Sequence, residues 1–499
     1  MKKKTILLFV SVFAYCYLFY NQGIGINFLI FNVLLVFASI SIDFSLVKRL
    51  NWLLVAAGAL ITATSAFLYG NLLSVIGNVI SLLFLAYVSY NPKSTLVFAF
   101  LQSTWTLISS IFLQIEKIFT PKPLKEGETE ETKSEFTFAD LLKFIIPIAV
   151  LVTFFLIYKY SNPVFSKFID NLNLDFISWT FVGFMLVGFY LLFVFYFPVN
   201  SQRLIRLDES SSNLLSGGIL PNEKSMFKDL SKEMSAAMMT FGLLNVLLLL
   251  VNVLDLNFIF SGQMKNITNY SQYVHQGINS SIFSVVIAIF VMLYFFRGNL
   301  NYVIKSKQLK YNALLWILLN AILLATCFHK NFSYIMESGL TYKRIGVYFY
   351  LFLTFIALIT TLVKITTFKS NWFLVRYNVW SLFLVLVFST LFNWDKLILE
   401  YNIKYKATIE REYYLFELEE VSYAHLLNHL DKMPHNDNYY LIGLSEDLFK
   451  KMLTVRIDKF MEKHQQKDWR SWNLEDDRMV NEILKTRKYF MKHPVYFNN

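Results

Sequence analysis

The chain has 499 residues, of which 56% are hydrophobic and only 16% charged, and it carries a formal net charge of +11. A soluble domain carries roughly 25% charged residues, and apolar runs this extensive need a bilayer to solvate them. The composition therefore excludes a soluble enzyme, a nucleic-acid-binding domain and a disordered chain. It predicts an all-α membrane protein whose excess of Lys and Arg marks cytoplasmic loops and contacts with anionic lipid headgroups.

Apolar runs that can cross, or nearly cross, about 30 Å of hydrocarbon recur along most of the chain. The first follows Lys2–Lys4, and we interpret it as a retained span because no small-x-small cleavage site comes after it. The runs predict a polytopic helical bundle of eleven or twelve spans, at 5–21, 25–42, 52–69, 72–90, 94–115, 143–159, 176–198, 236–258, 278–296, 311–328, 345–364 and 372–392.

The distribution of basic residues favours eleven crossings. If all twelve segments cross, Lys and Arg divide almost evenly between the two sides. Segment 94–115 is the weakest candidate, because it carries several Ser and Gln side chains such as Gln102 and Ser109. If this segment lies in the interface or re-enters, the side opposite the N-terminus keeps only Lys159, Lys167, Lys265, Lys330, Lys343 and Arg344. We therefore expect a cytoplasmic N-terminus and a periplasmic or extracytoplasmic tail, with twelve ordinary spans as the alternative.

Composition divides the chain into four parts. Residues 1–115 hold the N-terminal membrane helices, and 116–142 form a charged cytoplasmic linker rich in Lys, Glu, Thr and Pro. Residues 143–394 form the main membrane bundle, with a cytoplasmic loop at 199–235. Residues 395–499 are almost neutral and predict a soluble helical C-terminal domain, with helical patterns at 409–430, 445–464 and 474–490.

Two aromatic residues of the tail, Trp469 and Trp472, lie among charged neighbours in segment 468–473. Trp is favoured at membrane interfaces, so this segment could anchor the tail there. The alternative is that the two rings pack the tail on itself.

Motifs that would identify an enzyme are missing from the sequence. It has no P-loop, no GxSxG, no HExxH and no CxxC. His425 and His429 have a spacing that can hold zinc on a helix, but the neighbouring residues lack a ligand pattern and favour a solvated face. Cys16 and Cys327 lie in apolar segments and are interpreted as small hydrophobic residues. We therefore assign no catalytic residue, metal or cofactor, and the sequence favours a protein that is not an enzyme.

Placing a polar side chain in the hydrocarbon core costs free energy, so each polar residue inside a predicted span calls for a structural or functional explanation. Asn245, Asn252 and Asp255 are spaced by 7 and 3 residues, on one face of segment 236–258. His275, Gln276 and Asn279 follow at the entrance to 278–296. The functional interpretation is a polar binding site near the outer surface, made by Asp255, His275, Gln276 and Asn279, in which His275 can titrate near neutral pH. The alternative is interhelical hydrogen bonding, for which Asn and Gln are common.

Three cations complete the set of binding candidates. Arg297 directly follows segment 278–296, while Lys343 and Arg344 precede segment 345–364. In the eleven-span arrangement Lys343 and Arg344 lie outside, against the charge rule, and such cations can bind a phosphate or carboxylate. The alternative is snorkelling of their side chains to lipid headgroups.

Several stretches resemble an uncharacterised family of bacterial multi-pass inner-membrane proteins, described as a domain of unknown function. They are Tyr273–Asn279, Phe296–Asn301, Gly339–Arg344, Glu400–Ile403 and Tyr440–Asp447. The likeness is clearest over about 200–480, and members often carry Arg where this chain has His275. The resemblance implies a bacterial inner-membrane location and makes 273–344 the best candidate region, but it implies no activity.

Three functions fit these features. The first is transport of a small solute or lipid-linked anion, which should bring Asn252, Asp255, His275 and Asn279 together. The second is a membrane-embedded transferase on lipid-linked substrates, with Asp255 or His275 as general base. The third is a sensor or assembly protein, whose tail binds a protein partner. Membrane lipids are expected partners in each case, and nucleic acid is not.

Overall fold

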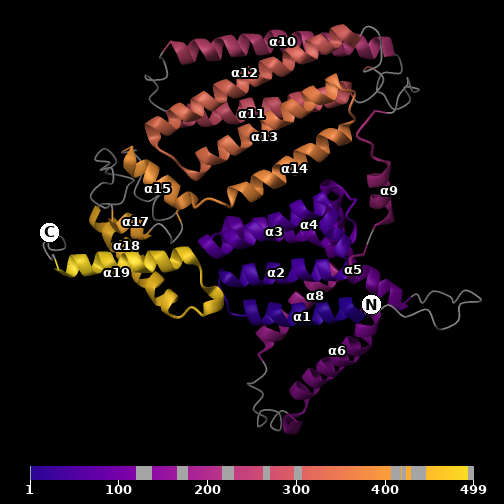
Figure 1. Cartoon of the computed structure of the whole chain (residues 1–499), viewed down its shortest axis with the longest axis vertical. Helices are drawn as coiled ribbons and strands as arrows, with labels where there is room; N and C mark the ends of the chain where they lie inside the picture. Colours follow the sequence, from indigo (N-terminus) through magenta and orange to yellow (C-terminus); the bar gives the residue numbers. More distant parts are fainter. Residues whose placement is uncertain are drawn as a thin grey trace, which may run out of the picture. The chain divides into compact units, whose positions relative to one another are not determined.

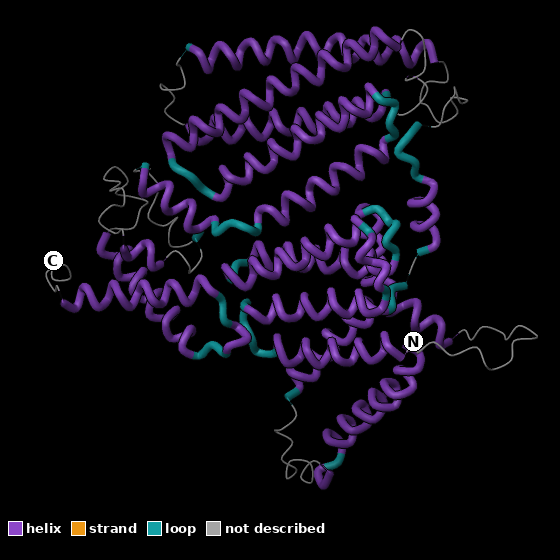
Figure 2. Tube along the Cα trace, in the orientation of Figure 1, coloured by secondary structure: helices purple, strands orange, loops and turns teal. Residues whose placement is uncertain are grey.

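The structure, a computed structural model, describes residues 2–119, 138–165, 178–199, 201–215, 230–261, 270–296, 300, 306–405, 417–418, 423–428 and 446–492. Every regular element in these ranges is a helix, as Figure 2 shows, apart from an isolated antiparallel bridge between Leu214 and Lys369. The predicted all-α fold class is therefore confirmed.

Each of the twelve predicted apolar segments coincides with a described helix (Figure 1). The helices are α1 (Lys2–Phe19), α2 (Ile26–Ile42), α3 (Leu50–Tyr69), α4 (Leu72–Tyr90), α5 (Leu96–Phe119), α6 (Phe138–Ser161), α8 (Trp179–Tyr196), α10 (Leu230–Phe260), α11 (Tyr270–Phe295), α12 (Ser306–Ser338), α13 (Tyr342–Thr366) and α14 (Asn371–Ser389).

Within the described ranges, seven of these helices are long and apolar enough to cross a membrane. They are α3, α4, α8, α10, α12, α13 and α14. The apolar stretches of α2, α5, α6 and α11 are shorter. Large apolar side chains such as Phe37, Val246 and Phe290 are exposed on these helices, and in a membrane-embedded chain lipid covers them. The number of crossings remains a prediction.

Shorter helices complete the described chain. They are η1 (Phe44–Lys48), α9 (Gln202–Ser210), α15 (Trp394–Lys404), α17 (Tyr423–Asn428), α18 (Glu446–Gln465), η6 (Trp469–Ser471) and α19 (Leu474–Lys492). Helices α18 and α19 confirm the predicted patterns at 445–464 and 474–490. The pattern at 409–430 lies mostly outside the described residues, and the charged linker is likewise outside them from 120 to 137.

The chain forms two compact units. The first contains Met1–Asp208 together with Lys467–Asn473, and the second contains Glu209–Gln466 together with Leu474–Asn499. A short tail segment therefore belongs to the first unit, although the helices before and after it, α18 and α19, belong to the second.

In the first unit, α1 runs antiparallel to α8. The Ser11 hydroxyl is 2.8 Å from the Tyr196 hydroxyl, and the Tyr20 hydroxyl is 2.9 Å from that of Ser178. The two helices approach closely at Gly188, where an added Cβ would collide with the Tyr15 ring. The close packing of these two helices thus depends on a residue without a side chain.

In the second unit, aromatic side chains form the centre of the core. Phe241 of α10 packs edge-on against Trp316 of α12, with ring centroids 5.1 Å apart, and also contacts Phe296 after α11. The carbonyl oxygen of Phe296 accepts a 2.6 Å hydrogen bond from the Nζ atom of Lys364, a residue of α13 that is only 1% exposed. A buried cation therefore satisfies a carbonyl at the C-terminal end of α11, where helices leave carbonyls unpaired.

Candidate functional site

The polar residues of α10 contact α12. The Asn245 Nδ2 atom donates to the carbonyl of Asn312 at 3.0 Å, and the Asn252 Nδ2 atom donates to the carbonyl of Leu319 at 2.9 Å. Both pairs are separated by 67 residues, so the two helices run parallel at this contact. The buried Oδ1 atoms of Asn245 and Asn252 accept no hydrogen bond from the described residues.

An ion pair continues this polar face. The Asp255 Oδ2 atom lies 2.8 Å from the Nζ atom of Lys330, with side-chain exposures of 18% and 5% respectively. Thr326, one turn before Lys330 on α12, places its hydroxyl 3.4 Å from the same carboxylate oxygen. Charges inside membrane helices are rare and usually functional, so this pair is the main candidate site of the second unit.

The guanidinium of Arg344 points to backbone carbonyls. It donates to the carbonyl of Ser338 at 2.5 Å and to that of Gly339, and it lies 3.9 Å from the centre of the Tyr334 ring. The Arg344 carbonyl in turn accepts a hydrogen bond from the Asn331 side chain at 3.1 Å. Arg344 therefore caps the C-terminal end of α12, while the neighbouring Lys343 is exposed.

The loop between α12 and α13 is also fixed to α15. Asn402 accepts a 2.6 Å hydrogen bond from the Leu340 N–H and donates one of 2.9 Å to the Leu340 carbonyl. The Tyr342 hydroxyl donates to Asp395 at 2.8 Å. The structure thereby brings together two of the stretches on which the family resemblance rests, 339–344 and 400–403.

The remaining predicted site residues are not joined to this group by any described contact. His275, Gln276 and Asn279 belong to α11, but their side chains lie outside the described residues, as does Arg297 altogether. Sequence reasoning missed Lys330 as the partner of Asp255, because the predicted span ended at 328 whereas α12 continues to Ser338.

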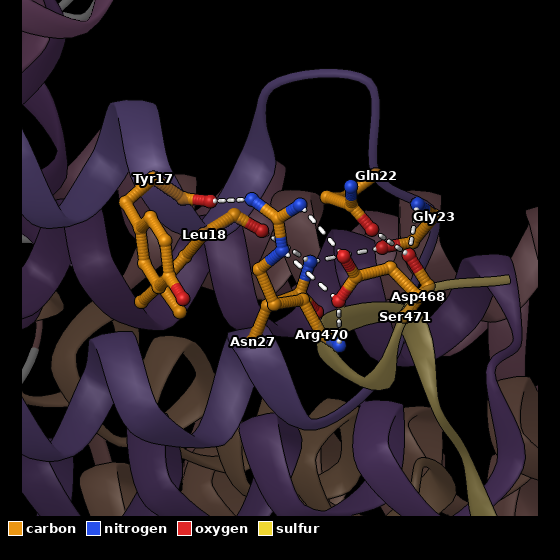
Figure 3. Close-up of polar contacts among 8 residues, drawn as sticks. All are labelled: Tyr17, Leu18, Gln22, Gly23, Asn27, Asp468, Arg470 and Ser471. Atoms are coloured by element: carbon orange, nitrogen blue, oxygen red, sulfur yellow. Dashed lines mark hydrogen bonds and ion pairs between the residues drawn. The ribbon is translucent and has the colours of Figure 1, made fainter.

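A second candidate site lies in the first unit, where residues 467–473 pack against the helix ends; we call this segment the tail clip. The Ser471 hydroxyl accepts a 2.8 Å hydrogen bond from the Gly23 N–H (Figure 3). The Trp472 carbonyl accepts a 2.9 Å bond from the N–H of Ile26, the first residue of α2. The clip thus satisfies a backbone donor that the start of a helix leaves unpaired.

Side chains of the clip also hold the end of α1. Arg470 donates to the Tyr17 carbonyl and pairs with Asp468 at 2.8 Å, so its guanidinium lies between these two acceptors in Figure 3. The Tyr17 ring contacts Trp469, with centroids 6.4 Å apart. The ring of Trp472 lies 5.5 Å from that of Phe67 on α3.

The loop that receives the clip is shaped by Asn27. Its side chain donates to the carbonyls of Leu18 (3.1 Å) and Gly23 (2.9 Å) (Figure 3). It also accepts from the Gly25 N–H at 3.0 Å. Gly25 lies so close to the clip that an added Cβ would be 2.5 Å from the Trp472 carbonyl oxygen. The surface that receives the clip therefore has room for glycine at position 25 but not for a side chain, because the clip backbone contacts it directly.

The clip should be less stable in acid. Hydrogen bonds from Arg470 hold the pKa of the Asp468 carboxyl below its usual range. A lowered pKa in the folded state adds stability above the ordinary Asp value of about 3.9, and this contribution is lost as the pH falls through the lowered value. Comparing thermal stability from pH 7 to pH 3 should show a smaller loss for Asp468→Asn than for the wild type. Identical pH profiles would exclude this role of Asp468.

These features define a helical integral membrane protein with several membrane-spanning helices and a buried ion pair. A family model described as a domain of unknown function (DUF4153) matches residues 6–447, and the chain belongs to this family. The match begins well before the region of clearest resemblance and covers parts of both units. No curated protein and no solved structure matches the chain.

Proposed function

We propose that the chain is a sensor or assembly protein of the bacterial inner membrane. In this proposal the tail binds a signal or protein partner, and the tail clip passes the change to the first helical unit. The observation that carries the proposal is that 467–473 belongs to the first unit, whereas α18 and α19 on either side of it belong to the second. A movement of the tail therefore acts directly on the loop between α1 and α2.

The clip also supports the predicted topology, with a cytoplasmic N-terminus and eleven crossings. It contacts the loop after α1 and, through Asn473, Gly70 at the end of α3. The loop after α1 lies at the end of that helix remote from the N-terminus. If α1 crosses, the tail lies on the side opposite the N-terminus, which requires an odd number of crossings. Segment 94–115 is our candidate for the apolar segment that does not cross.

A disulfide between the clip and the loop after α1 tests both the predicted side of the tail and the coupling of the clip to the first unit. An added Cβ at Gly23 lies 3.7 Å from the Ser471 Cβ, close to the separation of about 3.8 Å found in disulfides. We expect Gly23→Cys/Ser471→Cys, in a chain lacking Cys16 and Cys327, to form a disulfide outside the cytoplasm. If the clip is coupled to the cytoplasmic face, the oxidised protein should exchange backbone hydrogens several-fold more slowly at 43–49 than the reduced protein.

Two results would contradict the proposal. The control Ser41→Cys/Ser471→Cys keeps the tail cysteine but places its partner at the opposite end of α2, and it should not cross-link. Efficient cross-linking of this control instead of the Gly23 pair would place the tail on the N-terminal side. Slower exchange confined to 20–26 would make the clip a local anchor and exclude the sensor mechanism.

Transport of a small solute or lipid-linked anion is the second candidate. It is favoured by the Asp255–Lys330 ion pair and by the open Oδ1 atoms of Asn245 and Asn252 on the same face of α10. Intramembrane carboxylates paired with a cation often mark ion or substrate pathways. A carrier should lose uptake in Asp255→Asn while remaining folded. A sensor with the same substitution should still show slower backbone hydrogen exchange at 43–49 when the clip is cross-linked. No observation in the described residues favours the transferase alternative.

A further inference from the structure

A cavity of about 320 Å³ lies among α1, α2, α4, α5 and α8 of the first unit. Its wall is almost entirely apolar and includes Phe19, Phe31, Val79 and Leu192. An apolar cavity of about 150 Å³ in a soluble protein stays dry and accepts a small hydrocarbon. A cavity of twice that size between membrane helices is therefore expected to hold hydrocarbon and not water.

Three polar residues of the wall, Asn78, Ser103 and Thr106, form hydrogen bonds within the protein. The Asn78 side chain donates to the Ala59 carbonyl at 3.0 Å, and the Ser103 hydroxyl donates to the Leu83 carbonyl at 2.7 Å. Thr106 likewise donates to the backbone of its own helix. Since these groups are already bonded, the wall favours an apolar chain over a sugar or a charged solute.

The length of the cavity fits one acyl chain. Its wall includes residues of α4 from Val75 to Tyr87. At 1.5 Å per residue this stretch of helix rises by about 18 Å. Half of a hydrocarbon core of about 30 Å is roughly 15 Å, so one acyl chain can lie along this wall.

A small polar pocket adjoins one end of the cavity. Ala86, Phe195 and Pro198 line both spaces. The small pocket also contains Lys4 and the hydroxyl-bearing residues Ser39, Ser89 and Tyr90. The Ser39 hydroxyl already donates to the Leu35 carbonyl. The pocket thus offers a positive charge from Lys4 and the hydroxyl groups of Ser89 and Tyr90 at the mouth of a hydrocarbon-sized cavity.

We propose that the cavity and the adjoining pocket bind one membrane phospholipid with an anionic headgroup. One acyl chain lies in the cavity, and the phosphate group binds beside Lys4 in the leaflet on the N-terminal side. Charge complementarity identifies the lipid class, because an ammonium group next to hydroxyls recognises a phosphate with a net negative charge. This inference does not depend on the proposed sensor function.

Lipid binding to the purified full chain tests the inference. Native mass spectrometry would count bound lipids after addition of phosphatidylglycerol or phosphatidylcholine with identical acyl chains. We expect Lys4→Gln to lower the affinity for phosphatidylglycerol about tenfold, because it removes a charge-assisted hydrogen bond. The affinity for phosphatidylcholine should change little. Ala86→Phe, which fills the junction of the two spaces, should lower binding of both lipids.

The matched control is Lys3→Gln, which removes the same charge from an exposed neighbour that does not line the pocket. It should bind phosphatidylglycerol like the wild type. If Lys4→Gln and Lys3→Gln lower the affinity for phosphatidylglycerol equally, the lipid is attracted by the overall positive charge and not by the pocket, and the inference is overturned. Unchanged lipid binding in a folded Ala86→Phe variant would do the same, and the lysine comparison remains decisive if that variant does not fold.

Discussion

Lys330→Met should lower the free energy of unfolding by about 3 kcal/mol. The substitution leaves the carboxylate of Asp255 without the ammonium group that lies 2.8 Å away. Breaking a buried ion pair typically costs about 3–5 kcal/mol. The lower value applies because 18% of the Asp255 side chain is exposed. Thermal and denaturant-induced unfolding of the protein in detergent micelles would measure the loss.

Two further variants separate the ion pair from a general effect of charge. Lys343→Met removes an exposed lysine from the start of α13 and should change stability by no more than about 0.5 kcal/mol. Asp255→Asn combined with Lys330→Met should be more stable than the sum of the two single effects predicts, because neither charge is left alone. Equal losses for Lys330→Met and Lys343→Met, or strict additivity, would show that the pair does not stabilise the bundle.

Gly25→Ala should release the tail clip. The new methyl group would lie 2.5 Å from the carbonyl oxygen of Trp472, and backbone atoms on both sides leave little room for adjustment. Overpacking of this kind costs about 1–3 kcal/mol, which corresponds to an increase of about fivefold to 150-fold in the released population. Trypsin cleavage after Arg470, which binds Tyr17 in the docked clip, should accelerate accordingly.

Gly23→Ala is the matched control for this prediction. It adds the same methyl group two residues earlier, but there the Cβ would be 3.7 Å from the Cβ of Ser471, an ordinary contact distance. Cleavage after Arg470 should remain at the wild-type rate. If both variants accelerate cleavage equally, flexibility of the loop and not the contact with Trp472 controls release.

The sequence was most informative about single helices. Apolar runs about twenty residues long located every described membrane helix, because hydrophobic length and helical periodicity are local properties. The spacing of Asn245, Asn252 and Asp255 likewise placed them on one face of a helix. Helix ends were less well predicted, since Lys330 lies beyond the apolar run of 311–328 although α12 continues to Ser338.

The partners of the polar residues could not be predicted in the same way. The sequence suggested His275 as a partner of Asp255, and the His275 side chain lies outside the described residues; the partner that the structure shows is Lys330 from another helix. It treated Arg344 as a candidate anion site, whereas its guanidinium binds the carbonyls of Ser338 and Gly339. Both outcomes depend on which helices pack together and in which register, and one sequence without packing information does not fix either.

The sequence by itself determined the class of the protein, its helical segments and the residues with unusual polarity. The tertiary structure alone decided the Asp255–Lys330 pair, the cavity beside Lys4 and the tail clip. The clip is the clearest case, because Gly23 and Ser471 are 448 residues apart and their hydrogen bond carries no local pattern. Long-range contacts arise from the packing of the whole unit, so they become visible only when the helices are assembled.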